Sequence, residues 1–335
     1  MKILMILLFV PLFAVSSSGC GPEIQTAAPG TDRWPVRSSK FTPVDEYYGK
    51  LLVQDGEFEA ESATKPWSSW WYPVRENYLF QSDGNRLSPL EKYDRLVQRQ
   101  TGTLPGAAAY ERDNLYDSGA NAWEGLCNAW AIASIMVPQP TRPLTIEGIQ
   151  FGVGDLKALL IKSFEKVEGT RAFGQRYNGD RMSHFDDLYP DQFHGVLVGE
   201  LLTKGRPFII DKDPGVPVWN TPVWKVQYTV QRDPADAGIA HVKTWLFGAS
   251  PFVDSYDYVG TLSVVFEYTY DLMGEALPDG SLQVHYGSWT GSSADFHPDF
   301  VTILPEPESG SRESLNIKLQ PAIIDQILQT GKIRR

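Results

Sequence analysis

The sequence predicts an α+β fold in which a cysteine-bearing helix packs on an antiparallel sheet, extended by a C-terminal antiparallel β module. Three observations predict it. The stretch 123–136 becomes Ala-rich and apolar around Cys127, which is typical of a loop that enters a buried helix. Two apolar runs, 193–202 and 208–211, flank a Lys-Gly-Arg-Pro turn and indicate paired strands. Residues 262–272 alternate β-branched and aromatic side chains, as strands do.

Composition places the chain among globular proteins. Its 335 residues are 42% hydrophobic and 12% aromatic, with ten tryptophans, which is enough to bury a large core. The 41 acidic residues outnumber the 30 basic ones. Because binding to a phosphate backbone depends on clustered Lys and Arg, we expect no nucleic-acid partner.

The N-terminus indicates export. Lys2 precedes an apolar run over residues 3–15, which is the length of a signal-peptide core and too short to span a membrane as a helix. Small residues then lead to Cys20, so that 1–19 resembles a bacterial lipoprotein signal in which Cys20 receives the lipid. Ser17 stands where such signals usually carry Leu, and this leaves ordinary secretion as the alternative. We therefore expect the bacterial cell envelope or the secreted fraction.

The remaining organisation follows the composition along the chain. Residues 20–40 are rich in Pro, Gly, Ser and Thr and form a flexible tether, so that the membrane is a partner only through the lipid. We assign 41–237 to the catalytic core with its wrapping N-terminal segment and 238–306 to the β module. Residues 307–335 form a linker and a C-terminal helix.

Cys127 is the candidate nucleophile. If Cys20 carries lipid, Cys127 is the remaining thiol and no intrachain disulfide can form. At the start of a helix, free N–H groups and the helix dipole favour a thiolate and lower the pKa of a cysteine. The alternative is that Cys127 is a packing residue, since free cysteines are often buried.

Several elements surround this helix in the sequence. The segment 66–73 is rich in Trp and bounded by prolines, and we predict an irregular segment that packs on the main body, with a stacking platform for sugar or peptide as the alternative. Ser88 is an N-cap for a helix over 89–99. We interpret 151–162, with Asp155 near the helix N-terminus, as a surface helix.

The candidate proton-transfer groups follow on the two apolar runs. His194 lies at the mouth of the first predicted strand and Asp211 ends the second, so that a hairpin would bring carboxylate and imidazole together. Cysteine acyl transfer needs a thiolate, a histidine and a third group that holds the ring. The order helix-Cys127, strand-His194, strand-Asp211 is that of a papain-like, transglutaminase-like core. Asp213 and Asn220 are the alternatives to Asp211.

Six short blocks in this order resemble the transglutaminase elicitor family, which is named for secreted oomycete transglutaminases. The similarity runs from about Pro66 to Pro305. It implies Cys127 as nucleophile, His194 as general base and acid, and Asp211 as the residue that orients the ring. Asn128 and Ala129 depart from the pattern of the family, and this departure bears on how the substrate fits the site. The blocks are residues 123–131, 155–160, 190–194, 208–211, 218–222 and 297–300.

The resemblance implies a thiol acyltransferase that attacks protein glutamine side chains, for crosslinking to a primary amine or for deamidation. The partners would be a glutamine-bearing protein or peptide and an amine, and we expect a monomer. The alternatives are a cysteine peptidase or amidase on envelope peptides, and a surface-binding lipoprotein without catalysis. No cofactor is required by the sequence, and calcium stays open by resemblance alone. We interpret four other histidines as structural: His184, His241, His285 and His297.

Overall fold

The computed structural model describes residues 43–177, 187–306 and 311–333, and it shows a mixed α+β fold. The predicted signal peptide (1–19), Cys20, the tether 20–40 and His184 lie outside the described residues. In the described ranges, no helix is both long enough and apolar enough to cross a membrane.

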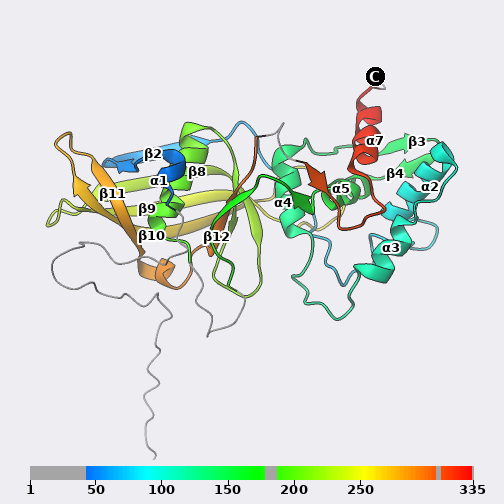
Figure 1. The fold of residues 1–335 in the computed structure, drawn as a ribbon, viewed down its shortest axis with the longest axis horizontal. Coiled ribbons are helices and arrows are strands. Elements are labelled where there is room, and N and C mark those ends of the chain that lie inside the picture. Colours follow the sequence, from blue (N-terminus) through cyan, green and yellow to red (C-terminus); the bar gives the residue numbers. More distant parts are fainter. Residues whose placement is uncertain (1–42, 178–186, 307–310, 334–335) are drawn as a thin grey trace, which may run out of the picture.

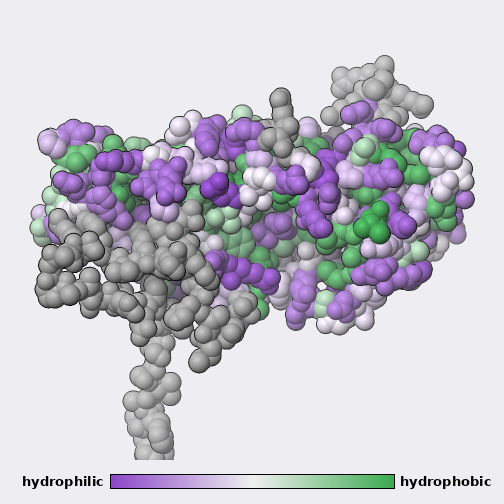
Figure 2. Space-filling model, viewed as in Figure 1, coloured by the Kyte–Doolittle hydropathy of each residue, from purple (hydrophilic) through white to green (hydrophobic). Residues whose placement is uncertain are grey.

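The molecule has a sheet half and a helical half (Figure 1). Helix α4, which carries Cys127, lies between them and packs on strand β8. Hydrophilic residues cover most of the face in Figure 2, broken by apolar patches where the halves meet and over the helical half. The α-helices are α1 Asp45–Tyr48, α2 Pro89–Thr101, α3 Ala107–Asn114, α4 Cys127–Met136, α5 Val153–Lys162, α6 Pro190–Val196 and α7 Pro321–Ile333.

Nine strands form the main sheet, and every pair in it is antiparallel. The order is β1-β11-β10-β9-β8-β7-β12-β6, with β2 also paired to β8. These strands are β1 Leu52–Val53, β2 Gly56–Glu61, β6 Arg171–Gly174, β7 Phe208–Asp211, β8 Asn220–Arg232, β9 Ile239–Ala249, β10 Ser263–Ala276, β11 Leu282–Trp289 and β12 Phe300–Ile303. The two small sheets pair β3 Leu144–Ile146 with β4 Ile149–Phe151, and β5 Lys166–Val167 with β13 Arg312–Glu313.

The main sheet is curled into a half-barrel. Strand β1 pairs with β11 at one end of the sheet, whereas β2 pairs with β8 in the middle of it. Only residues 54 and 55 separate β1 from β2. The outer edge of β11 must therefore curve back toward β8, and the β1–β2 segment closes the gap between them.

The prediction for the C-terminal strands is confirmed. Strands β9, β10 and β11 form where the sequence alternates β-branched and aromatic residues, and they continue the sheet begun by β7 and β8. The turn Pro278-Asp279-Gly280 joins β10 to β11, and Gly280 has a φ of 85°, a value that favours glycine.

The prediction of a strand over 193–202 is wrong. This stretch forms helix α6 followed by the π-helix η1 (Leu197–Thr203), and β7 pairs with β8 and β12 instead. Phe193, Val196, Leu197 and Leu201 are buried at helical spacing on the sheet core. Pro190 at the first turn was the local signal for a helix.

The helical half has its own core, built by α2, α4, α5 and α7 with the aromatic segment 66–73. Helix α2 begins at the predicted N-cap, where Ser88 and Glu91 form a capping box. Helix α5 is not on the surface, since all of its residues are buried. Its charged side chains therefore need partners inside the protein.

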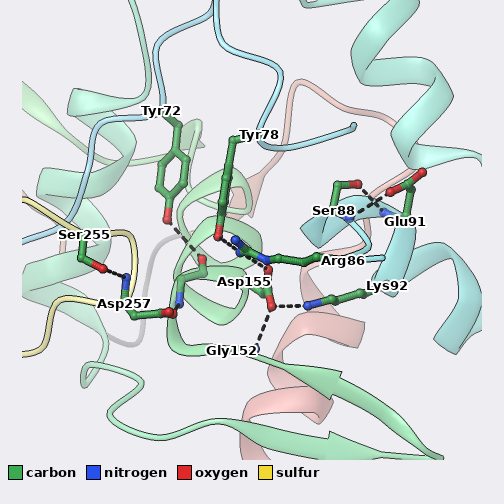
Figure 3. A network of polar contacts seen from close by, with 11 residues as sticks. Tyr72, Tyr78, Arg86, Ser88, Glu91, Lys92, Gly152, Asp155, Ser255 and Asp257 are labelled. Atoms are coloured by element: carbon green, nitrogen blue, oxygen red, sulfur yellow. Dashed lines mark hydrogen bonds and ion pairs between the residues drawn. The ribbon is translucent and has the colours of Figure 1, made fainter. Parts of the chain in front are cut away.

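Asp155 of α5 joins three parts of this half (Figure 3). One carboxylate oxygen accepts from Gly152 N at 2.7 Å and faces Lys92 Nζ of α2 at 2.5 Å. The other lies 3.2 Å from Arg86 Nη2. Asp155 is 1% exposed, so that the network holds a fully desolvated carboxylate between two cations. Tyr78, which also bonds Arg86, stacks on Tyr256 beside it.

Candidate active site

Cys127 is the first residue of α4, as predicted, and it is 6% exposed. Its thiol donates to Val218 O at 3.6 Å, and Asn220 Nδ2 donates to the sulfur at 3.5 Å. The backbone N–H groups of Asn128 and Asn220 are also directed at the sulfur. The helix start and the start of strand β8 thus surround one sulfur atom with hydrogen-bond donors.

Burial nevertheless raises the pKa of Cys127 above its ordinary value. The hydrogen bonds from Asn220 and Asn128 lower this pKa, and the nearby charge of Asp211 raises it further. The sequence-based prediction of a lowered pKa therefore does not hold, because desolvation outweighs the helix start. A buried neutral thiol needs a base to become a nucleophile.

The charge of Asp211 reaches this thiol, although no hydrogen bond joins the two groups in the described structure. It ends β7, where its register partner on β8 is Asn220, the residue that bonds the sulfur. Asp211 is completely buried; its Oδ1 accepts from Trp219 N at 2.9 Å, and its Oδ2 has no partner among the described residues. Burial raises the pKa of Asp211 to about 7, helped by the carboxylates of Asp299 and Asp213. A carboxylate with such a pKa is poised to accept and return protons near neutral pH.

A second buried carboxylate stands beside the first. Asp299 immediately precedes β12, which runs antiparallel to β7. The start of β12 therefore lies beside the end of β7, and this brings Asp299 close to Asp211. Its Oδ2 accepts from Tyr177 N at 2.8 Å, and its Oδ1 has no partner in the described part of the chain. Burial raises the pKa of Asp299 to about 7 as well. The charge of Asp299 is one of the causes that raise the pKa of Asp211.

The imidazole of His297 lies near the carboxylate of Asp299. Its Nε2 is 2.6 Å from Asp187 Oδ2, its Nδ1 is 2.7 Å from Ser293 O, and its ring stacks on Trp289. The carboxylate of Asp187 and the Ser293 carbonyl raise its pKa against the effect of burial, which lowers it. We interpreted this histidine as structural, yet its charge acts directly on Asp299.

The structure does not bring His194 to Cys127. The His194 ring packs edge-on against Tyr228, at 5.0 Å between centroids, and its Nδ1 is 2.7 Å from Tyr270 Oη. Tyr228 is eight residues along β8 from Asn220, which at roughly 3.3 Å per residue is about 25 Å. Burial also lowers the pKa of His194 to about 3, so that the ring is neutral. The predicted approach of His194 to Cys127 as general base and acid is therefore not found in the described structure.

Asn220 and Asp213, the alternatives to Asp211 as the third residue of the site, lie in different surroundings. Asn220 contacts the sulfur itself through its side-chain amide. Asp213 is half-buried in the turn after β7, where it accepts from Gly215 N at 3.1 Å and pairs with Lys212. Asn220 thus belongs to the site as a donor to the thiol, and Asp213 acts on it only as a nearby charge.

Aromatic side chains form a wall beside the cysteine. Trp71 packs edge-on against Trp219 at 5.5 Å and against Phe252 at 5.3 Å, and Phe252 is 52% exposed. Trp71 O accepts from Leu126 N at 2.6 Å, one residue before Cys127. A Cβ at Gly125 would come within 2.8 Å of Trp71 O, so that only glycine permits this approach. The predicted packing role of the segment 66–73 thus extends to the site.

No group of three or more His, Cys, Asp or Glu side chains in the described ranges is arranged to hold a metal ion. The site residues that our sequence analysis missed are Asp299 and the donor Asn220, which we weighed only as a ring orienter. Both lie in blocks quoted for the family resemblance, 297–300 and 218–222, and that placement was the available signal.

Comparisons with known proteins agree with this architecture. The family model described as transglutaminase elicitor matches residues 107–284, more than half of the 335 residues. The crystal structure of the GP42 transglutaminase from Phytophthora sojae is similar in fold, with a TM-score of 0.64 and 19% sequence identity over 86% of this chain and 96% of that chain. No match was found among curated proteins. The resemblance stated from the sequence is confirmed, and the chain belongs to the transglutaminase elicitor family.

Proposed function

We propose that the protein is a cysteine acyltransferase of the transglutaminase type that acts on glutamine side chains of proteins or peptides. The observation that supports this most is the buried Cys127 thiol at the start of α4, which accepts a hydrogen bond from Asn220, the register partner of the buried Asp211 on the neighbouring strand. Asp211 is near enough for its charge to act on the thiol, and its pKa of about 7 makes it the candidate base. Family membership supports the same reaction class.

In the proposed acylation, Oδ2 of Asp211 takes the thiol proton, and the sulfur attacks the glutamine carboxamide carbon. The donors of Asn128 and Asn220 stabilise the thiolate, and the N–H of Cys127 itself stabilises the oxyanion that forms. Asp211 then returns the proton to the leaving nitrogen, so that ammonia departs and a thioester remains. In this scheme Asp211 acts as the general base and acid, the role that the sequence analysis expected of His194, whose ring lies against Tyr270 instead.

In the proposed second half, a primary amine attacks the thioester, Asp211 accepts one amine proton, and that proton returns to the sulfur as the new amide forms. The carboxylates of Asp211 and Asp299 would attract a lysine ammonium group, which favours an amine over water, and the ammonium group loses one proton to solvent before the neutral amine attacks. We propose a monomer with no obligatory cofactor, as the sequence indicates.

The primary test follows a small primary amine into a glutamine-bearing protein by mass spectrometry, together with ammonia release. The wild-type chain should add the amine with loss of ammonia, and Cys127→Ala should abolish the product. Asn114→Ala, at an exposed position of α3 that contributes no contact to the site described above, serves as the control. Deamidation without amine addition would favour hydrolysis, and an inert wild-type chain would reject the proposal.

The pH dependence gives a second prediction. Because Asp211 must be ionised to accept a proton, kcat/KM should rise with pH through a midpoint near 7. Asp299→Asn should move this midpoint to lower pH, since the Asp299 carboxylate is one of the charges that raise the pKa of Asp211. The measurement is a pH–rate profile for both proteins. A midpoint that stays fixed or moves upward would show that Asp299 does not act on the base.

We further propose that the chain is a lipoprotein of the bacterial envelope, anchored through Cys20, with secretion as the alternative. Extraction of the wild type should then need detergent, and Cys20→Ala should move the protein to the soluble fraction. Fractionation with immunodetection measures this. An intact N-terminus upstream of Cys20 on the purified protein would end the anchor proposal.

A further inference from the structure

A half-open cavity of about 260 Å³ lies in the curled sheet at the β1–β2 closure. Its wall is mostly apolar and comes from β1, β2, α6, η1 and β8, together with the turn between β10 and β11. The apolar lining residues that matter here are Val53 of β1, Phe58 of β2, Val198 and Leu202 of η1, and Val230 of β8. The mouths of curled and closed sheets are common places for small-molecule sites.

One polar side chain lies in this wall without a full set of partners. His194 lines the cavity and is completely buried. Its Nδ1 is satisfied by Tyr270 Oη, which in turn lies 3.0 Å from Thr244 Oγ1. Its Nε2 has no hydrogen-bond partner among the described residues. A buried ring nitrogen that is left unpaired is costly, so that this atom calls for a ligand group.

The surrounding elements hold the histidine in place. Tyr228 packs edge-on against the His194 ring and stacks on Phe58 at 4.8 Å. On the far side of η1, Glu200 accepts from Tyr48 Oη at 2.7 Å and from Lys204 Nζ at 2.8 Å, which fixes the helix. A π-helix is rare and frequently marks a functional site. Here it presents Val198 and Leu202 to the cavity.

The chemistry of the wall selects the ligand class. The neutral ring can offer Nε2 as a donor or as an acceptor, depending on the proton of Tyr270, and a hydroxyl group matches either state. A carboxylate would be buried without a countercharge and would meet Asp279 at the rim. We propose that this cavity binds a small neutral molecule with an aliphatic body and one hydroxyl group, which bonds to His194 Nε2.

This site is separate from the proposed reaction centre. The His194 ring contacts Tyr228, about 25 Å along β8 from the residue that bonds Cys127, at roughly 3.3 Å per residue. The binding proposal therefore does not depend on the acyltransferase proposal, and each can fail without the other.

The test uses 1-octanol as the probe and the full chain carrying Cys20→Ala, so that no detergent is needed. Calorimetric titration should show saturable binding. Val198→Trp, which fills the cavity from the half-buried face of η1, should abolish it, and His194→Phe should weaken it about tenfold or more. Val265→Trp, on an exposed position of β10, is the matched control and should bind like the parent.

A second readout keeps the test independent of the folding of the His194 variant. In the parent chain labelled with ¹⁵N-histidine, 1-octanol should shift the Nε2 resonance of His194 and leave that of exposed His241 unchanged. Octanoate, which has the same body and a charged head, should bind at least tenfold more weakly. Equal binding by the parent and Val198→Trp, an unmoved His194 resonance, or tighter binding of octanoate would each overturn the proposal.

Discussion

Asp211→Asn is expected to lower kcat/KM for amine incorporation by about 10²–10⁴-fold, the range seen when a triad carboxylate is lost. An amide of nearly the same shape can still accept from Trp219 N, but it cannot take the thiol proton. Because burial holds Cys127 in the neutral form, the variant lacks a route to the thiolate. Labelling of the thiol by iodoacetamide at neutral pH should slow in parallel.

Two matched variants sharpen this experiment. Asp213→Asn removes a nearby, half-buried carboxylate and should cost far less, and His194→Phe should retain most of the activity, since that ring contacts Tyr228 and Tyr270. Circular dichroism and thermal melting check that each protein is folded. An inactive, folded His194→Phe protein beside an active Asp211→Asn protein would restore the histidine and remove Asp211 as the base.

Asp155→Asn is expected to lower the free energy of unfolding by about 3–5 kcal/mol, the cost of breaking one side of a buried ion pair. The change leaves Lys92, whose side chain is 10% exposed, as a buried cation without its carboxylate. Arg86 is 48% exposed and can turn to solvent, so that the loss comes mainly from Lys92. Urea denaturation of the two proteins measures the difference.

The control for this prediction is Asp113→Asn, which breaks the exposed pair with Arg112 and should leave the urea midpoint unchanged. The double variant Lys92→Met, Asp155→Leu should recover much of the loss, because it removes both buried charges together. If Asp155→Asn is as stable as the wild type, the network in Figure 3 does not hold α2 to α5.

Local sequence signals predicted much of the scaffold. The apolar change at Gly125 located the start of α4, the N-cap at Ser88 located α2, and alternation located β9 to β11. The strand prediction for 193–202 was wrong because a short apolar run is compatible with a strand and with a buried helix alike. The neighbouring apolar run favoured a strand, whereas Pro190 favoured the start of a helix.

The wrong strand prediction for 193–202 also led to the wrong position for His194 in the predicted site. With 193–202 as a strand, His194 would have reached the end of β7, whereas on α6 it enters the sheet core. Asp299 was out of reach of local reasoning, because its place beside Asp211 depends on β12 pairing with β7 across a long stretch of chain. Whether a helix start lowers a thiol pKa also depends on burial, which no spacing in the sequence reports.

The short connection between β7 and β8 has a consequence for how this protein could change during evolution. Asp211 ends one strand and Asn220 begins the next, so that the proposed base and the donor to the sulfur are the two ends of a single loop, residues 212–219. That loop contains Pro214 and Pro217, which limit its backbone freedom. Because Trp219 N donates to Asp211 and Val218 O accepts from the Cys127 thiol, substitutions inside the loop would alter the surroundings of both groups while the groups themselves stay chemically intact. Substitutions in this loop alone could therefore change the reactivity of the thiol, before any of the reacting side chains is replaced.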